Sequence, residues 1–215
     1  MNKFVDLPQV VEKLKDGMTV LVGGFLNSGG PVTILNAIAD SGIKDLTIIC
    51  NDAGFPDKGV GKIIASKQAK KLITSYIGSN SAAIDLMNNG ELIVEFSPQG
   101  TLAERIRAAG AGLGGVLTPT GLGTSVENGK EIITVNSRQY LLETPLKADI
   151  AIVGASVCDN DGNLHYKGTT RNFNPIVAMA ADVVIAEAEE IVETGALNPD
   201  IVHTPAILVD FIYKK

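Results

Sequence analysis

The sequence predicts an α/β fold: a single open, mostly parallel sheet with helices on both faces, plus a glycine-rich loop and a β-hairpin insertion. Two observations predict it. Short, fully apolar runs are typical of strands buried in parallel sheets, and helical segments of roughly 8 to 12 residues separate them. No composition shift or low-complexity linker divides the chain, so residues 1–215 are expected to form one domain.

The composition excludes several classes of protein. With 45% hydrophobic and 20% charged residues, the 215-residue chain is not disordered, and folding should bury roughly 70% of its surface. A net charge of −6 and only 5% aromatic residues leave no basic, stacking surface for nucleic acid. Asp149 and Asp182 interrupt the longest apolar runs, so no membrane span is expected.

The predicted location is the cytoplasm. The first six residues show no apolar signal-peptide region before Asp6. Cys50 and Cys158 lie far apart in the sequence, which fits a reducing compartment better than a disulfide scaffold.

The first half of the chain alternates regularly between the two kinds of element. Helices are expected at residues 8–15, 32–41, 61–69, 82–89 and 101–109, and strands at 18–22, 46–50, 71–77 and 91–96. Gly42 is placed to end the second helix, and Thr101 with Glu104 has the spacing of a capping box that would open the last one.

The second half is less regular. Residues 110–129 are too rich in glycine for a helix or strand and are expected to form a long ordered loop. Residues 132–142 alternate like a hairpin with its turn at Asn136-Ser137. Strands are expected at 150–153, 183–186 and 205–212, and residues 187–190 as an acidic surface stretch.

Ligands of open α/β sheets bind beyond the carboxyl ends of the strands. Four segments should meet there, namely residues 23–25, 51–54, 78–81 and 97–100. They are small and polar, with no histidine or cysteine and one acid, Asp52. Such a surface suits binding and polarising a substrate, and it lacks a nucleophile–base pair.

Nucleotide and metal sites are not indicated. No lysine lies between Lys15 and Lys44, so a Walker loop is absent, and the glycine order in residues 23–30 does not fit G-x-G-x-x-G. His165 and His203 have no further ligand at useful spacing, and residues 159–163 fail the calcium-loop pattern and predict a tight turn. We therefore expect no metal.

Residues 16–31, DGMTVLVGGFLNSGGP, carry a more specific pattern: Asp-Gly, three apolar residues, Gly-Gly-Phe, then Gly and Pro at fixed spacing. This pattern resembles the signature of the family I coenzyme A transferases. Further stretches resemble the α subunits of this family, closest to the acetate/butyrate–acetoacetate type; they are residues 97–107, 110–115, 118–124 and 171–175.

The resemblance implies a ping-pong exchange of coenzyme A between short-chain carboxylic acids, passing through a glutamyl-CoA thioester. In this family the nucleophilic glutamate belongs to the β subunit, so the resemblance implies a β-subunit partner, with an α2β2 assembly expected. Acyl-CoA and small carboxylic acids would be substrates, and no permanently bound cofactor is implied.

The resemblance also assigns candidate site residues. Gln99 would stabilise the oxyanion with its amide N–H, helped by the positive end of the following helix; the alternative is a glutamine that braces the loop. Gly23, Gly24 and Phe25 would shape the acyl pocket, although Phe25 could also be core. Asn51 would bind the carboxylate, or instead form an Asx turn into Asp52.

Three alternatives stay open. Glu127, in Ser-Val-Glu-Asn-Gly, is an imperfect echo of the family's Ser-Glu-Asn-Gly nucleophile motif, but a turn is the favoured interpretation. A stand-alone enzyme of related architecture, such as a sugar-phosphate isomerase, would need its own general base and a cationic phosphate site. A third possibility is a non-catalytic partner that only completes another chain's pocket.

Overall fold

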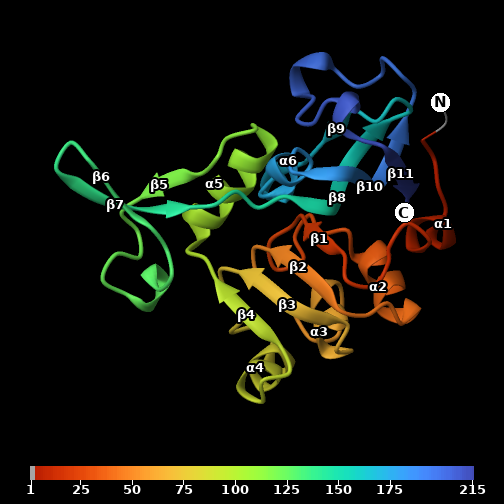
Figure 1. Cartoon of the computed structure of the whole chain (residues 1–215). Coiled ribbons are helices and arrows are strands. Elements are labelled where there is room, and N and C mark those ends of the chain that lie inside the picture. The colour runs from red at the N-terminus through yellow and green to blue at the C-terminus, as the bar shows by residue number, and fades with distance from the viewer. Residues whose placement is uncertain (1–2) are drawn as a thin grey trace.

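A central sheet of eight strands organises the computed structural model, which describes residues 3–215 (Figure 1). The strand order is β11-β10-β8-β1-β2-β3-β4, and β9 pairs with β8. All pairs are parallel except β8 with β9. The strands are β1 (Thr19–Val22), β2 (Leu46–Cys50), β3 (Ala69–Thr74), β4 (Ile93–Phe96), β8 (Ala148–Asp159), β9 (Leu164–His165), β10 (Ala181–Val192) and β11 (Phe211–Lys214). The predicted fold class is confirmed. Met1 and Asn2, part of the segment used for the signal-peptide prediction, lie outside the described residues.

Helices cover both faces of this sheet because its strands are apolar on both sides. On β1, Val20 and Val22 belong to one buried cluster and Leu21 to the other. The first cluster packs under α2 and α3, and the second packs under α5 and α6. The helices are α1 (Leu7–Val11), α2 (Val32–Ser41), α3 (Val60–Ala65), α4 (Ser81–Asn88), α5 (Gln99–Gly110) and α6 (Asn174–Val177). No helix within residues 3–215 is long and apolar enough to span a bilayer.

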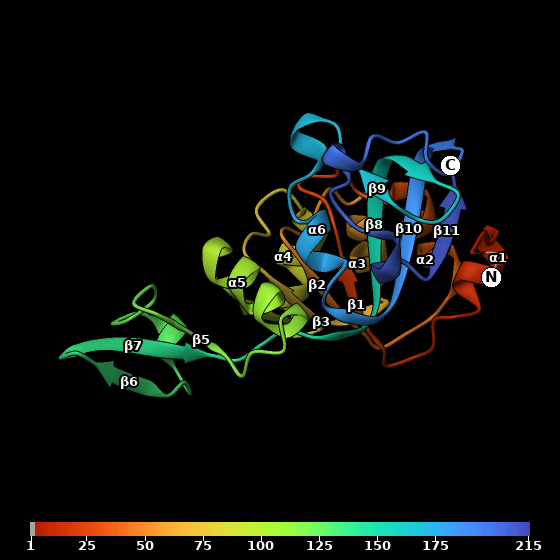
Figure 2. The same cartoon turned by 90° about the horizontal axis from the view of Figure 1, so that it is seen from above.

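A second, antiparallel sheet projects from the body of the molecule (Figure 2). Its strands β5 (Val116–Thr118), β7 (Arg138–Glu143) and β6 (Ile132–Val135) pair in that order, and we call residues 116–143 the arm. Asn136 and Ser137 both have positive φ angles, 50° and 63°, so the predicted hairpin turn is confirmed. The predicted loop at 110–129 is only partly right, because its residues supply β5 and the 3-10 turn η1 (Ser125–Glu127).

Three helix boundaries differ from the prediction. Helix α3 ends at Ala65 and not at residue 69, because Lys67 has a left-handed φ of 61°, and β3 therefore begins at Ala69 and ends at Thr74 instead of spanning 71–77. The first helix stops at Val11 because Lys13 and Leu14 donate to carbonyls three residues back, which tightens the chain into turns. Helix α5 begins at Gln99, since the N–H of Leu102 already bonds to the carbonyl of Pro98. The predicted capping box at Thr101 is therefore wrong, and Thr101 is buried in the first turn.

The strands of the second half also differ. Strands β8 and β10 are 12 residues long and pair from Ala148 with Ala181 to Asp159 with Val192, far beyond the apolar runs that predicted them. The last strand begins only at Phe211, because residues after Pro205 form a 3-10 turn.

Glu187 corrects the predicted acidic surface stretch. It lies inside β10, is 3% exposed, and accepts hydrogen bonds from the N–H groups of Thr33 (3.2 Å) and Ile34 (2.8 Å). Helix α2 has no side-chain cap of its own at Pro31, so a carboxylate from a distant strand satisfies these N–H groups instead.

Candidate active site

The carboxyl ends of β1 to β4 meet at one rim of the sheet. The N–H of Ala53 donates to the carbonyl of Tyr76 (2.9 Å), and that of Ser97 to the carbonyl of Thr74 (3.0 Å). The Ser79 hydroxyl donates to the carbonyl of Gly54 (2.7 Å). The segments expected to meet at this rim therefore lie side by side.

Two of the candidate residues contact each other at this rim. The Gln99 Nε2 donates to Asn51 Oδ1 at 2.8 Å, although 48 residues separate the two in sequence. Gln99 is the first residue of α5, so its amide lies at the N-terminal end of that helix. The two carboxamides form a neutral, donor-bearing pair rather than two independent side chains.

Asp52, predicted from the sequence only as the one acid of the rim, completes this cluster. Its Oδ2 accepts from Asn51 Nδ2 (2.7 Å) and from the N–H of Leu26 (2.9 Å), and its Oδ1 accepts from the N–H of Gly54 (2.9 Å). The bond to Gly54 is an Asx turn. The turn is thus made by Asp52 and not by Asn51, whose side chain is occupied with Gln99 and Asp52.

The Gly-Gly-Phe turn is fixed by close backbone packing. A Cβ on Gly23 would lie 1.9 Å from Asn174 Oδ1, and Gly24 has a φ of +109°, so neither position accepts a side chain easily. Asn174 holds the turn by donating to the carbonyl of Gly29 (2.9 Å). Phe25 is 41% exposed, so its interpretation as a core residue is wrong.

Large apolar side chains lie along the same rim of the sheet. One follows each of the first three strands and one ends the fourth, and all four are exposed; they are Phe25, Phe55, Tyr76 and Phe96. A rim that combines amide donors with exposed aromatic side chains suits the binding of an acyl group next to a polarised carbonyl.

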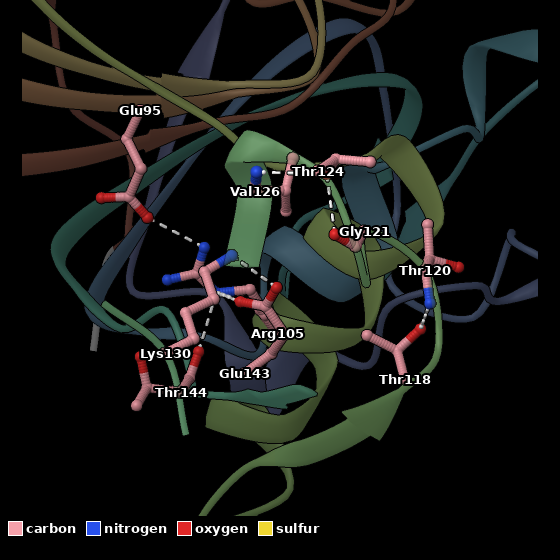
Figure 3. A network of polar contacts seen from close by, with 10 residues as sticks. All are labelled: Glu95, Arg105, Thr118, Thr120, Gly121, Thr124, Val126, Lys130, Glu143 and Thr144. Atoms are coloured by element: carbon pink, nitrogen blue, oxygen red, sulfur yellow. Dashed lines mark hydrogen bonds and ion pairs between the residues drawn. The ribbon is translucent and has the colours of Figure 1, made fainter. Parts of the chain in front are cut away.

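Glu127 is a turn residue, as predicted. It lies in η1 of the arm, and its Oε2 accepts a hydrogen bond from the N–H of Gly123 at 2.6 Å. The same turn is held by Thr124, whose hydroxyl donates to Gly121 and accepts from the N–H of Val126 (Figure 3).

A buried ionic network links α5 to the edge strand and to the arm (Figure 3). Arg105 donates to Glu95 Oε1 on β4 (2.9 Å) and to the carbonyl of Thr144 (2.8 Å), while Lys130 donates to Glu143 Oε1 (2.6 Å). Burial alone would raise the pKa of Glu95, but hydrogen bonds from Lys71 and Arg105 hold that pKa below its ordinary value. This network was not predicted from the sequence.

Both cysteines are buried away from the solvent, although Cys50 lies next to Asn51 in the sequence. Burial raises the pKa of the Cys50 thiol far above its ordinary value, and the charge of Asp52 raises it further. Burial, followed by the charge of Asp159, raises the pKa of Cys158 to about 12. Both side chains are buried.

We therefore expect no thiol of the native chain to react with Ellman's reagent at about pH 8, because the thiolate is the reactive form. Addition of guanidinium chloride should release both thiols at once. A thiol that titrates in the native chain within minutes would contradict the burial described here.

His165 and His203 stack on each other and form contacts with the backbone. Their rings stack with centroids 4.8 Å apart, His165 Nδ1 lies 3.0 Å from the carbonyl of Ile201, and His203 Nδ1 accepts from the N–H of Tyr166. Within residues 3–215, no three His, Cys, Asp or Glu residues are grouped so as to hold a metal ion. Asp159 accepts from three successive backbone N–H groups, which confirms the tight turn.

The fold is that of solved acyl-CoA transferases. The chain superimposes on an acyl-CoA transferase apoenzyme from Escherichia coli O157:H7 with a TM-score of 0.89 and 22% identity. This match covers 99% of the chain and 46% of the E. coli enzyme, so the chain spans about half of that relative. It also superimposes on glutaconate coenzyme A-transferase from Acidaminococcus fermentans with a TM-score of 0.86 and 21% identity, covering 99% and 75% of the two chains.

Residues 6–215 match the family model described as coenzyme A transferase, and the chain belongs to this family. It is 51% identical to the acetoacetyl-CoA:acetate/butyrate CoA transferase alpha subunit of Clostridium acetobutylicum, over 100% of this chain and 98% of the relative. It is 47% identical to the acetate CoA-transferase subunit alpha of E. coli K12, over 98% and 96%. The resemblance predicted from residues 16–31 is confirmed.

Proposed function

We propose that the chain is the α subunit of a transferase that moves coenzyme A between short-chain carboxylic acids, with acetate or butyrate and acetoacetyl-CoA as its substrates. The Clostridium acetobutylicum relative, which matches over the full chain, carries these substrates in its name, and the name of the E. coli K12 relative includes acetate. The observation that carries the proposal is the Gln99–Asn51 amide pair at the rim of the sheet. In this proposal residues 1–215 act as one domain, in the cytoplasm.

The reaction needs a nucleophile, which we assign to a glutamate of a β subunit. Its carboxylate attacks the carbonyl carbon of the acyl-CoA, and the C–S bond breaks. The coenzyme A thiolate departs, and the glutamate and the acyl group remain joined as an acyl anhydride. The thiolate then attacks the glutamyl carbonyl and releases the first acid, leaving a glutamyl-CoA thioester. The second acid reverses both steps, so atoms and charge balance with no further cofactor.

In this proposal the rim at the carboxyl ends of the strands polarises the thioester carbonyl of the acyl-CoA. One N–H of the Gln99 amide is engaged by Asn51, and the second is left to donate to the oxygen that becomes negative during attack. The position at the N-terminal end of α5 adds a favourable electrostatic field. The Asn51 amide has a second N–H besides the one that Asp52 accepts, and with it Asn51 helps to hold the substrate carboxylate. Gly23, Gly24 and Phe25 form one wall of the acyl pocket, where Phe25 is exposed.

The partner docks, in this proposal, on the same rim. Exposed aromatic side chains along this rim favour a covering partner, and a β subunit that brings its glutamate to Gln99 would cover them. The E. coli acyl-CoA transferase chain, of which this chain matches 46%, is long enough to hold a second half of similar size. We propose an α2β2 assembly.

The test measures loss of acetoacetyl-CoA after addition of acetate, with the purified chain alone and with its β subunit. We expect turnover only in the mixture, since the nucleophile lies outside this chain. Turnover by the chain alone would overturn the two-subunit assignment, and Glu127 would then be the first residue to replace. A mixture that assembles but does not transfer would overturn the proposed substrates.

A further inference from the structure

Asp52 is a buried carboxylate that no cation neutralises. It is 5% exposed, and no ion pair joins it to a lysine, arginine or histidine within residues 3–215. A buried charge is costly unless hydrogen bonds compensate it. Here three donors from two segments do so: the N–H of Leu26, the N–H of Gly54 and Nδ2 of Asn51.

This carboxylate decides how the amide pair is oriented. A carboxamide can turn by 180° and exchange its oxygen for its nitrogen, but a carboxylate only accepts. Asn51 must therefore turn its NH2 group toward Asp52, which leaves Oδ1 facing Gln99. Gln99 must in turn present its NH2 group to Asn51, so the orientation of both amides follows from the acceptor oxygens of one residue.

The same carboxylate holds the turn that carries Phe25. Its bond to the N–H of Leu26 joins the loop after β1 to the loop after β2. Leu26 and Asn27 have positive φ angles of 45° and 66°, a conformation that non-glycine residues adopt rarely and that such a bond helps to retain.

We propose that Asp52 is a positioning residue of the transfer reaction: by accepting from Asn51 and Leu26, it keeps the donor side of the Gln99 amide available to the substrate. This inference rests on the proposed function of Gln99. Asp52 does not touch the reacting atoms and acts through Asn51.

Replacement of Asp52 by asparagine keeps the shape of the side chain. It removes the acceptor-only carboxylate that fixes the orientation of the Asn51 and Gln99 amides. If the new oxygen stays near Asn51 and Leu26, the new NH2 group faces the N–H of Gly54. If the side chain turns, its NH2 group faces Asn51, which must turn as well and then presents its own NH2 group to Gln99. The first arrangement places two hydrogen-bond donors against each other. The second reverses the orientation of the Asn51 and Gln99 amides.

The test compares four variants of the assembled enzyme with its β subunit: Asp52→Asn, Gln99→Ala, the double variant, and Asp159→Asn as a matched control. Asp159 is equally buried and also accepts from backbone N–H groups, but its turn does not contact the amide pair. The measurements are kcat, the KM of the acyl-CoA, and the melting temperature.

We expect Asp52→Asn to lower kcat about tenfold or more with little change in KM, since removal of one oxyanion donor costs about a hundredfold or more and this substitution misplaces the donor without removing it. Its effect should vanish in the Gln99→Ala background, whereas Asp159→Asn should lower only the melting temperature. An Asp52→Asn effect that persists without Gln99, or that appears only in KM or the melting temperature, would overturn the positioning role. If Gln99→Ala itself leaves kcat unchanged, the proposed function fails instead.

Discussion

Replacement of Gln99 by alanine should lower kcat of the assembled enzyme about a hundredfold while the KM of the acyl-CoA stays nearly constant. The expected loss is that of one donor aimed at a developing oxyanion, which strengthens only in the transition state. Gln99→Glu should be at least as damaging, because it replaces the donors by a negative charge that faces Asn51 Oδ1.

The measurement is steady-state transfer from acetoacetyl-CoA to acetate. Gln9→Ala is a suitable control, since Gln9 is an exposed glutamine of α1 whose Oε1 accepts from the N–H of Asp6. Helix α1 lies well away from α5 (Figures 1 and 2). It should retain full kcat. Unchanged turnover in Gln99→Ala would leave this chain as a scaffold that only completes the pocket of its partner.

Replacement of Arg105 by methionine should destabilise the chain by about 3–5 kcal/mol, because it removes one partner of a buried ionic network. Methionine keeps the aliphatic length of the side chain, so the loss reports the charge and its hydrogen bonds. Arg105 Nε also lies 3.7 Å from Glu143 Oε2, and Glu143 is only 1% exposed. Glu143 would keep Lys130 as its partner and Glu95 would keep Lys71, which favours the lower end of this range. The Thr144 carbonyl would lose its donor.

Urea unfolding of the purified chain measures this loss. Arg107→Met is the matched control, two residues further along α5, where the exposed Arg107 pairs with Glu104 on the same helix. Exposed pairs contribute little, so its unfolding midpoint should not change. An equal midpoint for Arg105→Met and the unchanged chain would mean that the network does not stabilise the arm on α5.

The elements that sequence reasoning located well are those whose signals are local. The apolar run at 46–50 is β2, and the helix predicted at 32–41 is α2, which ends at Gly42 in the left-handed conformation that only glycine adopts without cost. Strand β10 was predicted too short because its polar residues interrupt the apolar run. The structure accommodates Glu187 within it through the N–H groups of α2, a compensation with no trace in the local sequence.

The candidate site shows the same division. Strand ends and their glycines are visible in the sequence, and they placed Gln99 and Asn51 at one rim. Their hydrogen bond and the control by Asp52 depend on how side chains from different loops meet, which no spacing encodes. Arg105 was missed for the same reason, because its partners come from β4 and from the base of the arm.

The central place of β1 has a consequence for the order of synthesis. Strand β1 pairs with β2 on one side and with β8 on the other. During synthesis, Val22 therefore has no pairing partner on the β8 side until Ile152 has been made. At a synthesis rate of about 5–20 residues per second, the β8-facing edge of β1 stays unpaired for roughly ten seconds after β2 has been made. An open, apolar strand is a template for pairing with other chains. A chain interrupted before β8 would therefore carry a half-sheet prone to association, and the nascent protein is protected only once its last third emerges.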